Sequence, residues 1–227
     1  MEEINKNSTN GFLYRYLPAE FGLQALQTGR LKIGRISELN DPHDCMPYIE
    51  NEKSYGALET SILQERHGVI SFSTKDNDPV IWSHYADCHR GIALKFHSDF
   101  LPDITERIEY TNIRPSVKDN MINDEHYIKG NLTKSIIAKF CHKAESWEYE
   151  GEVRIFPSLS GKKMRGTHYF YEIPKQSLKA VILGANCSLN WFDIQNAVKG
   201  SRLGISKIPV FRCSKQRDSF LMGIDRA

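Results

Sequence analysis

The chain has 227 residues and a formal net charge of +2, and its hydrophobic fraction of 40% and charged fraction of 26% are ordinary for a globular protein. No apolar run approaches the roughly 18 residues that a membrane span needs, and the polar first ten residues do not resemble a secretory signal. Five cysteines without a CxxC pair favour reduced thiols, and therefore a cytoplasmic protein, over a disulfide-stabilised secreted one.

The first half of the chain predicts strands that alternate with short helices. We expect a disordered tail over residues 1–10 and a single α+β domain over residues 11–227. Gly29 stands where a left-handed helix cap belongs, and Pro79 stands where a helix begins. Apolar spacing predicts strands over 12–17, 31–36, 69–74 and 91–96, and helices over 19–28, 55–66 and 80–86.

The second half continues without a regular strand-helix-strand rhythm. Ser188 is the expected cap of the last helix, and residues 162–166 are expected to form an exposed basic turn. The pattern predicts strands over 107–110, 150–156, 168–173, 180–183 and 205–213, and helices over 132–140 and 190–199. This mixture favours an α+β fold, with a mixed, mostly antiparallel, split sheet flanked by short helices, over a doubly wound sheet.

Charge is unevenly distributed along the chain. Residues 158–227 contain 12 Lys and Arg against 4 Asp and Glu, whereas residues 1–157 contain 18 against 24. A basic C-terminal third can face a polyanion such as a nucleic acid. It can equally be a solvated basic surface, because its basic residues are scattered rather than clustered.

The strand over residues 12–17 carries the first candidate site. Alternation places Tyr14 and Tyr16 on one face of this strand and Arg15 on the other. An arginine near the centre of a sheet needs an anion, and its guanidinium group matches the oxygens of a phosphate. Arg15 therefore either contacts a phosphate or ribose of a ligand or pairs with a nearby carboxylate.

A dense group of turn-forming residues, Asn40 to Asp44, is the second candidate. Asn40 or Asp41 can cap a local turn through backbone hydrogen bonds, or the loop can form the rim of a ligand pocket. His43, Asp44 and Cys45 could also bind a metal ion. No second cluster with metal-ligand spacing accompanies them, so we expect no metal centre.

A hydroxyl-rich strand and an aromatic helix form the third candidate. Ser71 and Ser73 lie on the strand, and Trp82, His84 and Tyr85 lie on the helix that follows. Trp82 and Tyr85 are three residues apart and share a helix face, which could stack on a planar ring. We expect one of these two to be a core residue and the other to line a pocket.

Three charged residues in register form the fourth candidate. On a strand over 150–156, Glu150, Glu152 and Arg154 project from one face and apolar residues from the other. This pattern is typical either of an exposed edge strand with an ordinary ion pair or of a catalytic carboxylate oriented by an arginine. Gly151 would let a second backbone or a ligand approach closely.

Taken together, these motifs resemble a known family. The resemblance to the uncharacterised microbial family catalogued as domain of unknown function 2971 extends over roughly residues 12–211. Its most specific parts are WSHYAD followed by a glycine, and W-x-Y-E-x-E-x-R. The segments that carry it are LYRYL, LNDPHDC, ISFST, WSHYADCHRGIALKF and WEYEGEVRIF.

More distantly, the order of motifs is similar to the ADP-ribosyltransferase superfamily, which includes phage-defence toxins. That superfamily presents an Arg or His on its first strand, a Ser/Thr-rich strand before an aromatic helix, and a late Glu-x-Glu. Arg15, the pair Ser71 and Ser73, and Glu152 match that order. The resemblance implies an ADP-ribosyltransferase-like fold and an enzyme that uses NAD as a substrate, in phage defence or a toxin system.

The resemblance also implies roles for individual residues. Glu152 would stabilise positive charge on the ribose, Glu150 would face the nucleophile, and Arg15 would hold the diphosphate or ribose. Ser73 would brace Glu152 or the ribose, and Trp82 or Tyr85 would stack on nicotinamide. The residues expected to contact NAD are Tyr14, Arg15, Asn40, Asp41, Ser71, Ser73, Trp82, His84, Tyr85 and Arg154.

Two other functions remain open. A non-catalytic nucleotide- or nucleic-acid-binding module would use the basic C-terminal third, which could also receive a nucleic-acid or protein acceptor. A different hydrolase would use His43, Asp44 and His84, with or without a metal. We expect no membrane partner, and the sequence does not predict an oligomeric state.

Overall fold

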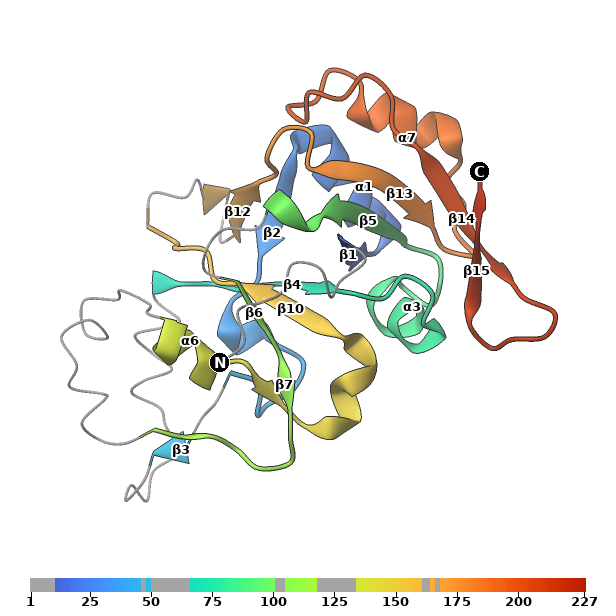
Figure 1. Cartoon of the computed structure of the whole chain (residues 1–227). Coiled ribbons are helices and arrows are strands. Elements are labelled where there is room, and N and C mark those ends of the chain that lie inside the picture. Colours follow the sequence, from blue (N-terminus) through green and yellow to red (C-terminus); the bar gives the residue numbers. More distant parts are fainter. Residues whose placement is uncertain are drawn as a thin grey trace. The chain divides into compact units, whose positions relative to one another are not determined.

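The computed structural model describes residues 11–45, 48–49, 66–100, 105–117, 134–160, 164–165 and 168–227 (Figure 1). The tail expected over residues 1–10 lies outside these described residues, as does most of the helix expected over 55–66. The chain forms two compact units. The first contains Met1–Leu31, Phe72–Leu101 and Glu172–Ala227, and the second contains Lys32–Ser71 and Pro102–Tyr171.

The first unit is built on a mixed sheet whose strands follow the order β15-β14-β13-β5-β1-β4. Four of the neighbouring pairs are antiparallel, and only β13 and β14 run parallel. Of β4, the residues in this unit are Phe72 and Ser73. The strands are β1 (Phe12–Leu17), β4 (Ile70–Ser73), β5 (Ile92–His97), β13 (Leu178–Leu183), β14 (Val210–Lys215) and β15 (Met222–Arg226).

Three α-helices, each with a defined cap, accompany this sheet: α1 (Ala19–Thr28), α3 (Pro79–Tyr85) and α7 (Trp191–Val198). Gly29 ends α1 at φ 67°, a left-handed conformation that glycine adopts without strain. The Asp78 carboxylate accepts hydrogen bonds from two backbone N–H groups at the start of α3. Asn190 caps α7 in a reciprocal pair with Asp193, so the expected cap, Ser188, is wrong by two residues.

The helices of the first unit bury apolar side chains against the sheet. Gly22 of α1 packs on Ile92 of β5 so closely that an added Cβ would lie 2.3 Å from that side chain. Trp82 of α3 packs edge-on against Tyr16 of β1, with ring centroids 4.9 Å apart. The fully buried residues include Leu26, Ile81, Trp82, Ile92, Leu94, Phe96, Val181, Leu183 and Ile194.

The second unit contains short strands and helical turns. β10 (Glu152–Ile155) pairs antiparallel with β6 (Thr105–Arg107), and β7 (Glu109–Tyr110) pairs parallel with β9 (His142–Lys143). Of β2 (Arg30–Ile33) and β12 (His168–Glu172), only residues 32–33 and 168–171 belong to this unit. Its other elements are η2 (Ile36–Glu38), β3 (Tyr48–Ile49), β8 (Ser116–Val117), α6 (Lys134–Lys139), η4 (Glu145–Glu150) and β11 (Met164–Arg165). Its apolar core includes Ile36, Cys45, Val69, Ile108, Ile137, Phe140, Cys141 and Phe156.

The predicted fold class is confirmed: the protein is α+β, with a large, mixed, mostly antiparallel sheet and few helices. None of the described helices is both long and apolar enough to cross a membrane. The five cysteines are free thiols, as expected. The chain divides into two compact units, and the prediction that it forms a single domain stays a prediction.

Several predicted boundaries are wrong. The strand expected over 150–156 begins only at Glu152, because Glu150 ends the 3₁₀-helix η4. Met164 and Arg165, expected in a turn, form β11 and pair with β12. The strand expected over 107–110 is two strands, β6 and β7, and the strand expected over 205–213 begins at Val210. β15 was not predicted at all, because its short apolar stretch lacks a clear alternating pattern.

Candidate functional site: a buried charge cluster

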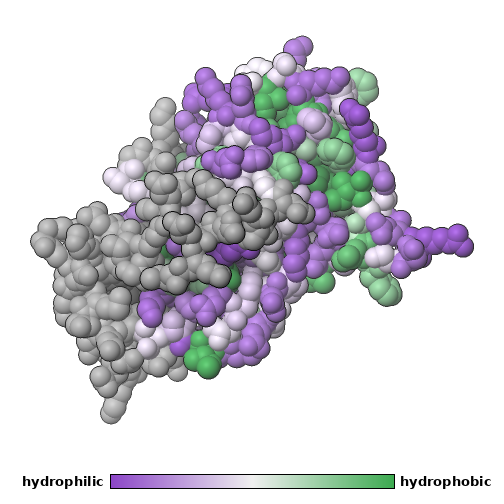
Figure 2. All heavy atoms as spheres, viewed as in Figure 1, coloured by the Kyte–Doolittle hydropathy of each residue, from purple (hydrophilic) through white to green (hydrophobic). Residues whose placement is uncertain are grey.

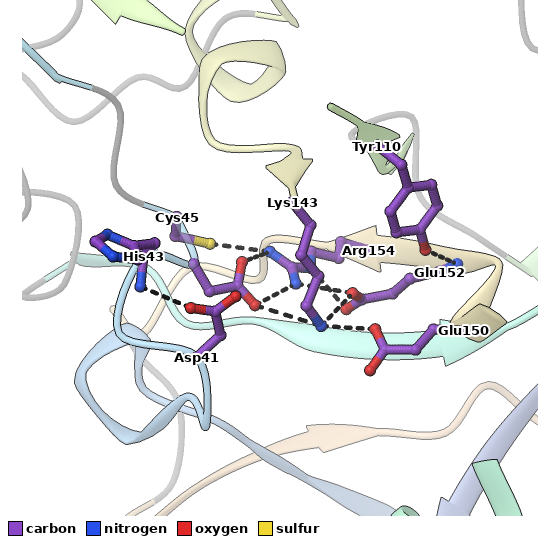
Figure 3. Close-up of polar contacts among 9 residues, drawn as sticks. Asp41, His43, Cys45, Tyr110, Lys143, Glu150, Glu152 and Arg154 are labelled. Atoms are coloured by element: carbon purple, nitrogen blue, oxygen red, sulfur yellow. Dashed lines mark hydrogen bonds and ion pairs between the residues drawn. The ribbon is translucent and has the colours of Figure 1, made fainter. Parts of the chain in front are cut away.

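Five charged side chains meet in the interior of the second unit (Figure 3). Glu152 opens β10 and Arg154 follows two residues later. Lys143 ends β9, Glu150 ends η4, and Asp44 lies in the turn that follows η2. Each of the five is at most 6% exposed. We call these five residues the buried charge cluster.

Arg154 is the central donor of the cluster. Its Nη1 and Nη2 atoms donate to the two carboxylate oxygens of Asp44 at 2.6 and 2.7 Å. Its Nε and Nη2 atoms donate to the two oxygens of Glu152 at 2.7 and 2.8 Å. Nη1 also donates to Sγ of Cys45 at 3.1 Å, so each of the five guanidinium N–H groups has an acceptor. A cofactor could bind to Arg154, as predicted, only by replacing one of these bonds.

The carboxylate of Glu152 accepts hydrogen bonds from three side chains. Besides the two bonds from Arg154, Lys143 Nζ donates to Oε2 at 3.4 Å and the Ser71 hydroxyl also donates. These four bonds match the about four lone-pair positions of a carboxylate. Burial alone raises the pKa of a carboxyl group, but the charges of Arg154 and Lys143 outweigh burial and lower the pKa of Glu152 to about 2. Glu152 is therefore ionised at neutral pH.

Lys143 lies among the three carboxylates of the cluster. Its Nζ atom is 2.6 Å from Glu150 Oε2, 3.4 Å from Glu152 Oε2 and 3.7 Å from Asp44 Oδ2. The same atom lies 4.6 Å from the centroid of the Trp147 ring, which favours a cation. Burial lowers the pKa of a lysine, but the charges of Glu152 and Glu150 raise the pKa of Lys143 above its ordinary value. Lys143 therefore stays positively charged and interacts with all three carboxylates of the cluster.

The backbone around residue 151 orients the two glutamates of the cluster. Gly151 ends η4 at φ 51°, so the chain turns sharply between Glu150 and Glu152. This left-handed turn is what requires the glycine, where sequence analysis expected the close approach of a backbone or ligand. The N–H group of Glu152 donates to the Tyr110 hydroxyl at 2.7 Å, and burial raises the pKa of Tyr110. Tyr110 therefore helps to fix the start of β10.

The turn after η2 brings Asp44 to the cluster. Asp41 Oδ1 accepts a hydrogen bond from the His43 N–H at 2.9 Å, which is the local turn capping that the sequence allowed. Asn40 opens the same turn. Cys45 follows Asp44 with a positive φ of 55°, and burial raises the pKa of its thiol to about 12. The Cys45 thiol is therefore protonated and unreactive at neutral pH.

The predicted site residues are divided between the two units. Those in the second unit are Asn40, Asp41, Ser71, Glu150, Glu152 and Arg154, and those in the first unit are Tyr14, Arg15, Ser73, Trp82, His84 and Tyr85. Ser71 contacts Glu152 in the role that was expected of Ser73, whereas Ser73 Oγ accepts a bond from the Lys75 N–H at 3.0 Å. The predicted convergence of Arg15 and Tyr85 with Glu152 joins residues of different units and stays a prediction.

In the first unit, aromatic side chains hold the loop that joins β4 to α3. The Tyr14 hydroxyl donates to the carboxylate of Asp76, and the Tyr16 hydroxyl donates to the Lys75 carbonyl at 2.7 Å. Trp82 Nε1 donates to the Asp76 carbonyl at 2.7 Å. Burial raises the pKa of Tyr14, and the Asp76 charge raises it further. Tyr14 and Trp82, both predicted to contact a cofactor, therefore hold this loop.

The aromatic residues of α3 differ in exposure. Trp82 is fully buried, so it is the core member of the expected pair. Tyr85 is half-buried and remains the candidate for stacking on a ligand ring. His84 is exposed and lies edge-on to Tyr85, with ring centroids 6.1 Å apart.

Arg15 projects from the face of β1 opposite to Tyr16. Tyr16 contacts α3, whereas α1 covers the other face, where Gly22 packs against Ile92. A single ligand bound by both Arg15 and Tyr85 would therefore have to reach both faces of β1.

Among the residues that the structure describes, no group of three or more His, Cys, Asp and Glu side chains could hold a metal ion. Of the candidate ligands, His43 and Asp44 belong to the second unit and His84 to the first. Both carboxylate oxygens of Asp44 bind Arg154. A cation bound at Asp44 would therefore have to compete with the guanidinium group.

Sequence analysis missed two members of this site, Lys143 and Tyr110, and considered Cys45 only as a metal ligand. Lys143 lies between an apolar helix face and the WEYE segment. Its position as a single lysine before the two glutamates of the cluster was the one sequence feature that could have indicated a partner for them. Tyr110 acts through its hydroxyl on a distant backbone N–H, which no local pattern indicates. Cys45 is adjacent to Asp44, but only the fold places its sulfur beside Arg154.

Comparison with known proteins gives one match. Residues 81–155, about a third of the chain, match the model of the family described as "Protein of unknown function (DUF2971)". The matched segment includes most of α3 and most of the buried charge cluster, and it is shorter than the resemblance expected over residues 12–211. No curated protein and no solved structure matches the chain. Over residues 81–155, the chain is therefore similar to the family of unknown function DUF2971.

Proposed function

We propose that this protein binds NAD and transfers ADP-ribose to a macromolecular acceptor, as an enzyme with an ADP-ribosyltransferase-like fold. One observation carries the proposal: Glu152 is an ionised carboxylate, fixed in the interior of the second unit by Arg154, Lys143 and Ser71. Its pKa of about 2 means that it acts through its charge and does not exchange a proton near neutral pH.

The chemistry requires a fixed negative charge. When the bond between nicotinamide and ribose breaks, its electron pair leaves with nicotinamide and positive charge develops on the ribose. A carboxylate already held in place stabilises that charge without reorganising, and its effect is larger in a water-excluded interior. The acceptor then forms the new bond to the ribose carbon and loses a proton. In this proposal the carboxylate of Glu150 accepts that proton.

The hydrogen bonds of Glu152 leave one route for a ribose hydroxyl. The longest of them is the 3.4 Å contact with Lys143 Nζ, which has a much shorter contact of 2.6 Å with Glu150. A ribose hydroxyl that replaced the longer contact would leave Lys143 paired. The roles that the family resemblance implies for Arg15, binding the diphosphate, and for Tyr85, stacking on nicotinamide, stay predictions.

The test measures NAD binding by calorimetry and nicotinamide release by chromatography on the full chain. Glu152→Gln should lower nicotinamide release by about 10²- to 10³-fold, because it removes the fixed charge but keeps the shape of the side chain. Glu148→Gln makes the same change on an exposed residue of η4 and should leave release unchanged. A wild-type protein that neither binds NAD nor releases nicotinamide would rule the proposal out.

The second candidate is a non-catalytic nucleotide- or nucleic-acid-binding module. The saturation of the cluster favours it, because Arg154 uses all five N–H groups and Glu152 accepts four bonds, as in a purely structural ion network. Under this alternative, Glu152→Gln lowers stability, but the folded variant binds its nucleotide as tightly as the wild type does.

A further inference from the structure

A hairpin at the end of the chain presents an aromatic ring to solvent. β14 and β15 pair over five residue pairs, and their connection projects beyond the sheet of the first unit (Figure 1). Phe220 in this connection is 98% exposed and Leu221 is 48% exposed. A phenylalanine that buries nothing contributes nothing to the core, so the position is suited to an external contact.

Basic side chains surround this ring in the chain. Among the exposed charged residues between 199 and 226, the two acidic ones are Asp218 and Asp225, and the six basic ones are Lys199, Arg202, Lys207, Lys215, Arg217 and Arg226. Figure 2 shows polar and apolar side chains intermingled on the side of the molecule where Figure 1 draws β14 and β15. The hairpin therefore combines positive charge with an exposed aromatic ring.

A second exposed aromatic group lies at the start of α7. Phe192 is 70% exposed, and Arg212 of β14 donates to the Leu189 carbonyl at 2.6 Å, which ties the start of α7 to this strand. Lys215 follows Arg212 by three residues and therefore projects from the opposite face of β14. Phe192 is therefore not counted with the hairpin surface.

We propose that this hairpin binds single-stranded nucleic acid, with Lys215 and Arg217 contacting phosphates and Phe220 stacking on a base. Exposed rings can stack only on bases that are not already paired in a duplex. Insertion into a membrane would instead need a larger apolar area. This binding is independent of ADP-ribosyl transfer.

The experiment titrates the full chain into a fluorescein-labelled oligothymidylate strand and follows anisotropy at several salt concentrations. Binding should weaken as salt rises, with a log–log slope of about −1.4 if two phosphates are neutralised. Phe220→Ala should weaken binding about tenfold. Lys215→Glu combined with Arg217→Glu should weaken binding further and make the salt slope shallower. All three residues are exposed, so these variants should fold.

Matched controls use the same unit. Phe21 of α1 is 54% exposed, and Lys179 lies toward the opposite end of β13, so Phe21→Ala and Lys179→Glu should bind like the wild type. Glu152→Gln should also bind normally, which separates this inference from the proposed function. The inference is overturned if the wild type does not bind at low salt, or if the controls weaken binding as much. Preference for a duplex of the same length, or Phe220-dependent binding to phosphatidylserine vesicles without oligonucleotide binding, would overturn it too.

Discussion

The interior of the first unit is apolar, whereas the interior of the second unit contains charges. Among the described residues, every buried Asp, Glu, Lys and Arg belongs to the second unit and to the buried charge cluster. Each apolar side chain of the first unit contributes to stability by leaving water, whatever the charge of its neighbours. Each charge of the second unit is stabilised only while its partners remain, so the second unit should be more sensitive to single substitutions and to pH.

The largest effect is expected from removing the central cation. Arg154→Met leaves the carboxylates of Asp44 and Glu152 buried without their bidentate partner, which should destabilise the second unit by about 3–5 kcal/mol. Urea unfolding measures the change in the free energy of unfolding, and native-state hydrogen exchange shows which strands are destabilised. Amides of β10 should lose protection while those of β5 keep theirs.

The control for this change is Arg202→Met. Arg202 is an exposed arginine of the first unit, 3.5 Å from Glu172, and its loss should cost less than about 1 kcal/mol. An Arg154→Met variant as stable as this control would contradict the proposed dependence of the second unit on its ion network.

A smaller loss is expected from truncating the apolar core of the first unit. Leu26→Ala removes a fully buried side chain of α1 and should cost about 3 kcal/mol, through lost burial and the cavity that remains. Because no ionisable partner is removed, the cost should be the same at pH 7 and pH 4. If the stability lost in Leu26→Ala changed strongly with pH, the two units would not differ in their sensitivity to pH as expected.

The smallest of these effects is the pH dependence contributed by Glu152. Its pKa is about 2 in the folded protein, below the ordinary value of 4.5, so its stabilisation is present above pH 5 and is lost as pH falls toward 2. The wild type should lose about 2 kcal/mol between pH 7 and pH 3 relative to Glu152→Gln, which cannot titrate there. Parallel urea curves for the two proteins across this range would show that the ion pairs do not stabilise the ionised form.

Local signals predicted many elements of the first unit. Gly29 and Pro79 were placed correctly at a helix end and a helix start, because cap preferences follow from the conformation of one or two residues. Trp82 was one of two residues proposed for the core, and helical spacing alone could not decide between it and Tyr85. Its burial depends on contact with Tyr16, which is distant in sequence.

The candidate site was predicted only in part. Glu150, Glu152 and Arg154 were expected on one strand face, and all three do meet, although Glu150 arrives from a 3₁₀-helix rather than from the strand. Ser71 was expected at a ligand site and contacts Glu152 directly. Lys143 was missed, because its partners are brought to it from separate elements that no periodic pattern connects.

The sequence by itself determined the α+β class, the mostly antiparallel sheet, the end of α1 at Gly29 and the start of α3 at Pro79, and the family resemblance, because these depend on residue spacing and short motifs. Only the tertiary structure decided that Asp44, Lys143 and Arg154 form one ion network in the second unit. Coulomb attraction and desolvation depend on distance and burial in space. Residues 110 positions apart in the chain can therefore share a hydrogen bond that their order in the sequence does not reveal.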